Sequence, residues 1–170
     1  MKNVVCLMCA VCMSIFAVSC ATTEVKEQPV VATSLGSDAI VKAQNEQLAK
    51  VSVEGFALGN ADVPAQKWDS WAKVAAPAVK TIIDNLPKGY VFQVTGHADS
   101  TGSEDASAGF VGNKKLSEQR AYAVYSSLKK QGITSSRITY KGVGSSEPLS
   151  GVSGDGDAQR RVSFRVVASN

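Results

Sequence analysis

The order of the apolar segments after Val51 constrains the fold of this chain more than any other feature. Two segments, 68–85 and 113–131, carry apolar residues at helical spacing. Around them lie short runs rich in β-branched and aromatic residues, at 51–56, 90–94, 138–140 and 162–167. The resulting order β-α-β-α-β-β predicts an α+β fold over residues 51–170. In this two-layer sandwich both helices pack on one face of a mixed sheet.

Each predicted helix has an apolar face with a defined end. The first carries its apolar residues at three- and four-residue steps, at Trp71, Val74, Ala75, Val79, Ile82 and Ile83. The second is expected to bury Ala121, Val124, Tyr125 and Leu128. Asn113 is its predicted N-cap, and Gly132 is predicted to end it. Residues 145–159, rich in Ser, Gly and Asp, are expected to form a surface loop.

The first nineteen residues have the layout of an export signal. Lys2 supplies a positive start, and residues 4–18 form an apolar run too short to span a bilayer. The run ends in AVSC, and small residues directly before Cys20 resemble a bacterial lipobox. We therefore expect cleavage after residue 19 and lipidation of Cys20. The alternative is an ordinary secretory signal cleaved near the same point.

The cysteines favour lipidation. Of the 4 in the chain, three lie inside the signal segment, so cleavage leaves Cys20 alone. A single cysteine cannot form a disulfide within an exported domain, whereas lipidation would account for a lone cysteine at the cleavage point. Each buried methylene of an acyl chain, such as a palmitate, contributes about 0.8 kcal/mol, and several chains give a stable bilayer anchor.

The segment between Cys20 and the predicted domain is expected to act as a tether. Residues 21–37 are rich in Thr, Glu, Val and Ser and lack a sustained helical or strand period. Residues 38–50 form a short helix, stay disordered or pack on the domain edge; the sequence leaves these alternatives open. Loss of the signal segment removes Lys2 and no acid, which lowers the formal charge from +3 to +2. Such a balance argues against a nucleic-acid partner.

Two motifs place opposite charges close to each other in the predicted fold. Asp99 follows the strand at 90–94, and Arg120 lies near the start of the next helix. Together they suit a ligand that carries both an ammonium and a carboxylate. Two structural interpretations compete with this one. The Asp99 side chain hydrogen-bonds the backbone of its own turn, or Asp99 and Arg120 form a plain salt bridge.

Four separated blocks in the C-terminal half resemble the OmpA-like peptidoglycan-binding domain. The blocks are GHADSTG at 96–102, NKKLSEQRA at 113–121, GVGSSEP at 142–148 and QRRV at 159–162. The resemblance departs from the family pattern at Ala98, where Thr is usual, and at Gln159, where Asn is usual. Residues 103–112 are also several positions longer than the family spacing.

The resemblance implies non-covalent binding of the peptidoglycan stem peptide at its diamino acid, typically diaminopimelate. Asp99 would accept from the ammonium and Arg120 would hold the carboxylate with its planar fork. Thr101 and Asn113 would add neutral hydrogen bonds, and either Arg161 or Arg160 would complete the charge of the pocket. With an acylated Cys20, the protein would link a membrane, by analogy the outer membrane facing the periplasm, to the cell wall. The alternative is a fold kept for binding other envelope proteins, with the pocket reshaped by residues 103–112.

The sequence favours neither an enzyme nor a metal or cofactor site. His97 is the only histidine, and the cysteines do not supply it with zinc-ligand partners. The chain has no G-x-S-x-G motif for a hydrolytic nucleophile. His97 is therefore expected to have a structural role.

Overall fold

The computed structural model of the chain describes residues 31–62 and 65–169. The signal segment, Cys20 and the first part of the predicted tether lie outside these residues. The described elements are α1 (Val31–Leu48), β1 (Ser52–Val53), α2 (Ala65–Asp84), β2 (Tyr90–Gly96), α3 (Asn113–Lys130), β3 (Ile138–Gly142), the short 3-10 helix η1 (Asp157–Gln159) and β4 (Val162–Ala168). From β1 onwards, the strands and α-helices follow the predicted order.

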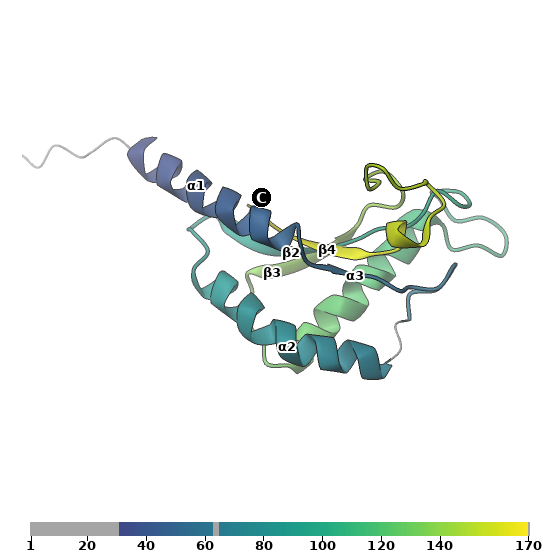
Figure 1. The fold of residues 1–170 in the computed structure, drawn as a ribbon, viewed down its shortest axis with the longest axis horizontal. Helices are drawn as coiled ribbons and strands as arrows, with labels where there is room; N and C mark the ends of the chain where they lie inside the picture. The colour runs from purple at the N-terminus through teal and green to yellow at the C-terminus, as the bar shows by residue number, and fades with distance from the viewer. Residues whose placement is uncertain (1–30, 63–64, 170) are drawn as a thin grey trace, which may run out of the picture.

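The strands of the described chain form one mixed sheet in the order β1-β4-β2-β3. β2 is parallel to β3 and antiparallel to β4, and β1 pairs antiparallel with the start of β4. α2 and α3 cover the same face of this sheet (Figure 1). The predicted α+β architecture, with helices on one face of a mixed sheet, is confirmed.

The core lies between the sheet and the two covering helices. Phe164 of β4 stacks on Trp71 of α2 and on Phe92 of β2, with ring centroids 5.5 and 5.7 Å apart. From α3, the predicted stripe contributes Ala121, Val124 and Leu128, all fully buried.

Several predicted core positions are not fully buried. Trp71, Ile82 and Tyr125 are only partly buried, although they pack against the core, and Val74 is 81% exposed. Val74 is exposed because the buried face of α2 follows different positions, Ala72, Ala76, Val79 and Ile83. These recur at helical spacing, and Val74 lies on the opposite side of the helix.

Helix α1 corrects the predicted tether. Its described residues are Val31–Leu48, so residues 31–37 are helical rather than irregular, and of the alternatives left open for residues 38–50 the helix is the one observed, as far as Leu48. The Asn45 side chain donates to the carbonyl of Val166 (3.0 Å) and accepts from its N–H (2.7 Å). Leu48 is buried in the core. α1 therefore covers the edge of β4 beyond its short pairing with β1, and this tertiary contact explains a helix that the sequence pattern marks only weakly.

No helix of the described residues is long and apolar enough to cross a membrane.

Candidate ligand-binding site

The first turns of α3 rest directly on the ends of β2 and β3, and two motif glycines permit this contact. A Cβ on Gly96 would lie 1.9 Å from the carbonyl oxygen of Ser117, and one on Gly142 would lie 2.3 Å from the next backbone nitrogen of α3. The Ser117 hydroxyl also accepts from the Gly144 N–H at 2.8 Å. The two strand ends and the start of α3 therefore form one unit, here called the platform, from which residues 97–101 emerge.

Asp99 is buried at the end of the platform and has two hydrogen-bond partners. Its Oδ1 accepts from the backbone N–H of Thr101 at 3.0 Å, which closes a local turn. Its Oδ2 accepts from Nη1 of Arg160 at 2.9 Å, in an ion pair whose side chains are 4% and 11% exposed. The structural interpretation of Asp99 as a turn residue is therefore correct, and its salt-bridge partner is Arg160.

Arg120 is 0% exposed and donates to three backbone carbonyls. Nη1 bonds the carbonyl of His97 at 2.9 Å, Nε bonds that of Asn60 at 2.9 Å and Nη2 bonds that of Ala57 at 3.1 Å. The guanidinium also lies 5.3 Å from the ring centroid of Phe56. Burial lowers the pKa of Arg120 to about 10, and the charge of Asp99 partly opposes this shift. Arg120 thus stays protonated at neutral pH.

The two arginines of the QRRV block have different roles. Arg160 donates to the carbonyl of Phe56 (2.8 Å), to Asp99 and to Asp157. The hydrogen bond to Asp99 raises the pKa of Arg160. Arg161 instead donates to the carbonyl of Glu147 at 2.9 Å and so anchors the loop 145–159. Arg160 is therefore the arginine that contacts Asp99.

Thr101 and Asn113 lie beside Asp99 but differ in exposure. Thr101 is exposed, whereas Asn113 is 2% exposed. Asn113 donates its side-chain amide to the carbonyls of Asp99 (3.1 Å) and Thr101 (3.2 Å). Its predicted role as N-cap is wrong, because Gly112 precedes the helix with a φ of 81° and no side-chain cap. The Asn113 amide holds the 99–101 turn instead.

Residues 103–112 connect the platform to the loop after β3. The carbonyls of Ser103 and Glu104 accept from the first N–H groups of α3, at 2.9 and 3.1 Å, and so take over the capping. The Glu104 carboxylate accepts from the Ser145 N–H at 3.0 Å. At the far end, Phe110 lies so close to Gly102 that a Cβ there would be 2.9 Å from the ring. This segment therefore packs against the turn that carries Asp99.

His97 is buried behind Asp99. Its Nε2 is 2.8 Å from the hydroxyl of Ser163, and its backbone carbonyl receives Arg120. Burial, together with the nearby charges of Arg161 and Arg165, lowers the pKa of His97 to about 3. A neutral, buried ring that supports the platform fits the structural role expected for it.

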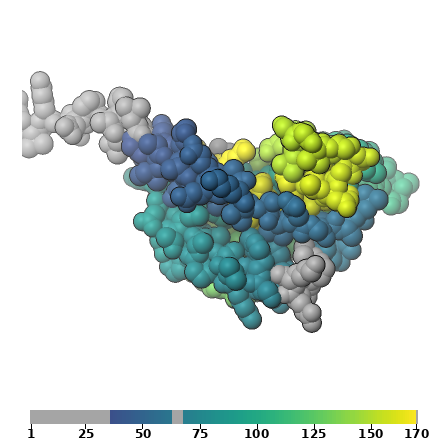
Figure 2. Space-filling model, viewed as in Figure 1, coloured from purple at the N-terminus to yellow at the C-terminus, as the bar shows by residue number. Residues whose placement is uncertain are grey.

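The clamp predicted from Asp99 and Arg120 is thus brought together and then enclosed. Sequence reasoning missed the segment 56–60, which supplies the Phe56 ring and two of the carbonyls that hold Arg120. The oxygens of this segment that accept from Arg120 belong to the backbone, so the residue types in the sequence do not indicate the contact. In the space-filling view this segment, in blue, adjoins the loop 145–159, in yellow-green, on the surface (Figure 2).

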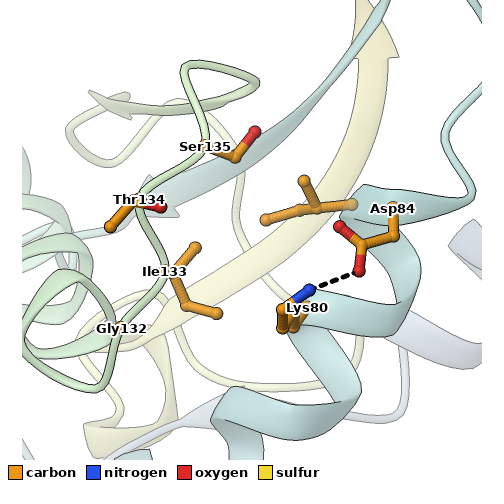
Figure 3. A pocket seen from close by; sticks show the side chains of 7 residues that line it. Lys80, Asp84, Gly132, Ile133, Thr134 and Ser135 are labelled. Atoms are coloured by element: carbon orange, nitrogen blue, oxygen red, sulfur yellow. Dashed lines mark hydrogen bonds and ion pairs between the residues drawn. The ribbon is translucent and has the colours of Figure 1, made fainter.

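A small hollow lies away from the clamp, between the end of α2 and the turn after α3. It encloses about 130 Å³, and Ile133, Thr134 and Ser135 line it on one side (Figure 3). Lys80 and Asp84, on the other side, form an exposed ion pair at 2.6 Å. Such pairs are common on helix surfaces and do not indicate a site. The described residues also contain no group of three or more His, Cys, Asp or Glu that could hold a metal ion.

Comparison with proteins of known structure finds the same fold. The C-terminal domain of Helicobacter pylori MotB has a TM-score of 0.53 at 20% identity, covering 71% of this chain and 87% of that one. The peptidoglycan-associated lipoprotein from Burkholderia pseudomallei has a TM-score of 0.52 at 23% identity, covering 71% of this chain and 92% of that one. At these identities the two structures show a shared fold.

Comparison of sequences identifies the family. The "Probable lipoprotein YiaD" of Escherichia coli (strain K12) is 39% identical over 84 residues, which span 49% of this chain and 35% of YiaD. The match thus covers about a third of that relative. Residues 56–161, which include the first three motif blocks and residues 159–161 of the fourth, match the OmpA family. The chain belongs to the OmpA family.

Proposed function

We propose that this protein binds peptidoglycan non-covalently, at the diamino acid of the stem peptide, and performs no chemistry on it. The observation that carries the proposal is the meeting of a carboxylate and a guanidinium at one end of the sheet. Asp99 lies near enough to Arg120 to influence its pKa, and Arg120 bonds the carbonyl two residues before Asp99. Membership of the OmpA family supports the same function.

In the proposed complex the ligand replaces contacts that the protein makes with itself. An ammonium would compete with Arg160 for the Asp99 carboxylate, and a carboxylate would replace the carbonyls on Arg120. Exposed Thr101 is available to add a neutral hydrogen bond. Asn113 would contribute by holding the turn around Asp99, since its amide already bonds two carbonyls there. Arg160 is the better candidate for the additional cation, because it contacts Asp99 directly, whereas Arg161 bonds the carbonyl of Glu147.

The proposed binding is weak at each site. Two or three charge-assisted hydrogen bonds contribute about 1.5–3 kcal/mol each. After the cost of association this corresponds to a Kd on the order of micromolar to millimolar. A lipid-anchored domain facing a polymer with many copies of its ligand rebinds at high effective concentration, so weak sites still hold the membrane and the cell wall together.

The proposed anchor is an acylated Cys20 in the outer membrane, with the domain facing the periplasm. The AVSC sequence across the expected cleavage point supports it. Labelling cells with a clickable palmitate analogue tests the anchor directly. The wild-type protein should take up the label and move to the membrane fraction, whereas Cys20→Ser should do neither.

A second candidate function is that of a structural or protein-binding module whose wall ligand has been lost. The burial of Asp99 and Arg120 favours it, because both side chains are already satisfied within the fold. Under this alternative, residues 103–112 would reinforce the closed site through Glu104 and Phe110.

Titration with two muropeptides separates these candidates. One carries diaminopimelate with its free carboxylate, and the other carries lysine, whose side chain has only the ammonium. We expect the mature chain, residues 20–170 in detergent micelles, to bind the first measurably and the second at least tenfold more weakly, since the carboxylate contact would contribute about 1.5–3 kcal/mol. Equal affinity for both would exclude the role proposed for Arg120, and no binding of either would favour the second candidate.

A sacculus pull-down tests the residues themselves. The double variant Asp99→Asn, Arg120→Lys should partition into the soluble fraction while the wild type sediments with sacculi. Arg165→Gln is the matched control, since it removes an exposed cation from β4. Thermal melts should first establish that each variant is folded. Equal retention of the wild type and a folded double variant would contradict the clamp.

A further inference from the structure

Two backbone carbonyls of the segment 57–60 occupy the edge of Arg120 that would hold a carboxylate. In a guanidinium, the N–H bonds of Nε and Nη2 point the same way and form the fork that binds two oxygens side by side. Nε donates to the carbonyl of Asn60 at 2.9 Å and Nη2 to that of Ala57 at 3.1 Å. Nη1 bonds the carbonyl of His97, within the platform. The segment therefore occupies the position that the two oxygens of a ligand carboxylate would take.

The segment 57–60 is anchored by the buried residue before it, Phe56, and is itself exposed. Phe56 is 1% exposed, and its carbonyl accepts from Arg160. The next four residues are all exposed, and Leu58 is exposed by 64%. The turn closes on itself through the Asn60 N–H, which donates to the carbonyl of Ala57 at 3.1 Å. Gly59 has a φ of 66°, and a Cβ there would meet no atom within 4 Å.

A wide groove lies on the other side of the same segment. It encloses about 720 Å³ and is lined by Gly59 and Asn60 together with Trp68 of α2 and Leu116, Gln119 and Tyr122 of α3. This volume is in the range of sites that take small ligands. Asn60 thus faces the groove and also covers Arg120, so the groove and the guanidinium are separated by the thickness of one turn.

We propose that residues 57–60 form a self-bound lid on Arg120, and that a ligand carboxylate arriving through the groove displaces the Ala57 and Asn60 carbonyls. This inference rests on the proposed function. A carboxylate bonds a guanidinium more strongly than a neutral carbonyl does, so an anionic ligand opens the lid and a neutral one leaves it closed. The apparent affinity is the intrinsic affinity reduced by the fraction of molecules with the lid open.

Gly59→Ala tests the lid by straining the closed turn without filling space. An L-residue at positive φ is disfavoured by about 1–2 kcal/mol, which makes the open form about fivefold or more populated. The variant should therefore bind the diaminopimelate muropeptide about fivefold more tightly than the wild type. Gly89→Ala is the matched control, because Gly89 has a φ of 84°, equally open surroundings and a position in the turn before β2. The control should bind as the wild type does.

Hydrogen exchange on the wild-type mature chain supplies an independent measurement. Ligand binding usually protects amides, but here the Asn60 N–H should exchange faster when the muropeptide is bound, because the turn has lost its two contacts with Arg120 and its one internal hydrogen bond then opens more often. Unchanged affinity in Gly59→Ala, or an Asn60 amide that is equally or better protected with ligand, overturns the lid while leaving the proposed function intact. Binding by Gly59→Ala but not by the wild type supports the lid. If neither protein binds the muropeptide, the proposed function and the lid are overturned together.

Discussion

Replacing Gly96 with alanine is expected to destabilise the fold strongly, because β2 and α3 meet there without room for a side chain. The added Cβ would lie 1.9 Å from the carbonyl oxygen of Ser117 and 3.0 Å from the backbone nitrogen of Ala121. Both atoms belong to the backbone of α3, so a side-chain rotation cannot relieve the contact. The whole start of the helix would have to move away from the strand.

The size of the effect follows from that movement. Ordinary contact needs about 3.4 Å, so the Ser117 carbonyl must withdraw by about 1.5 Å from its present 1.9 Å. A shift of this size pulls Ala121 and Val124, both 0% exposed, out of a close-packed core and separates the Ser117 hydroxyl from the Gly144 N–H. Overpacking a core costs about 1–3 kcal/mol, and we expect the upper end, about 3 kcal/mol, since helix backbone has to move.

Chemical denaturation measures this loss, with Gly36→Ala as the matched control. Gly36 lies in α1, and a Cβ there would meet no atom within 4 Å. The same change should therefore stabilise the control by up to about 1 kcal/mol through helix propensity. A loss below about 1 kcal/mol for Gly96→Ala would refute the argument that the motif glycine is required by close packing.

Three further changes test other contacts. Because folding lowers the pKa of His97 to about 3 from its ordinary 6.5, the folded state favours the neutral ring. The contribution of His97 to stability is present above pH 6.5 and falls as the pH drops towards 3, by on the order of 5 kcal/mol in total. Denaturation midpoints of His97→Gln should therefore fall less steeply with acid than those of the wild type, and parallel curves would contradict this assignment. Asp99→Asn should cost about 2–3 kcal/mol, because Arg160 loses a buried partner, whereas Asp84→Asn, in an exposed pair, should cost little; equal melting temperatures for the two would count against it. Asn45→Ala should cost about 1–2 kcal/mol and speed hydrogen exchange at Val166, and unchanged exchange would show that Asn45 does not close the edge of β4.

The sequence predicts those parts of the fold in which periodicity and burial agree. Ala121, Val124 and Leu128 recur on one side of α3, and all three are in the core. Helix α1 was only partly predicted, because its stability comes from docking on β4 through Asn45 and Leu48 rather than from a strong apolar stripe. A distant strand edge that needs hydrogen-bond partners leaves no mark in the local sequence of the helix that supplies them.

The residue types that meet at the candidate site are predictable from the sequence, but their pairing is not. Sequence reasoning identified Asp99, Arg120 and the two adjacent arginines, yet left open whether Arg160 or Arg161 approaches the acid. Adjacent residues at a strand entrance point in different directions, and the choice depends on η1 and the loop before it. Asn113 was misassigned for a related reason. Its amide fits an N-cap, but the carbonyls of residues 103 and 104 already serve the first N–H groups of α3.

Burial, rather than the helix dipole, is the reason that Arg120 requires partners. Helix α3 begins at Asn113, so Arg120 lies beyond its first turn, where the dipole effect has already declined. A guanidinium with 0% exposure, in contrast, loses its hydration, and each buried N–H left without an acceptor carries a cost in free energy. The carbonyls of Ala57 and Asn60 meet that requirement in the unbound protein. A ligand therefore has to bring acceptors at least as strong, side by side, to the same edge of Arg120, which a free carboxylate does and a neutral amide or an ammonium does not.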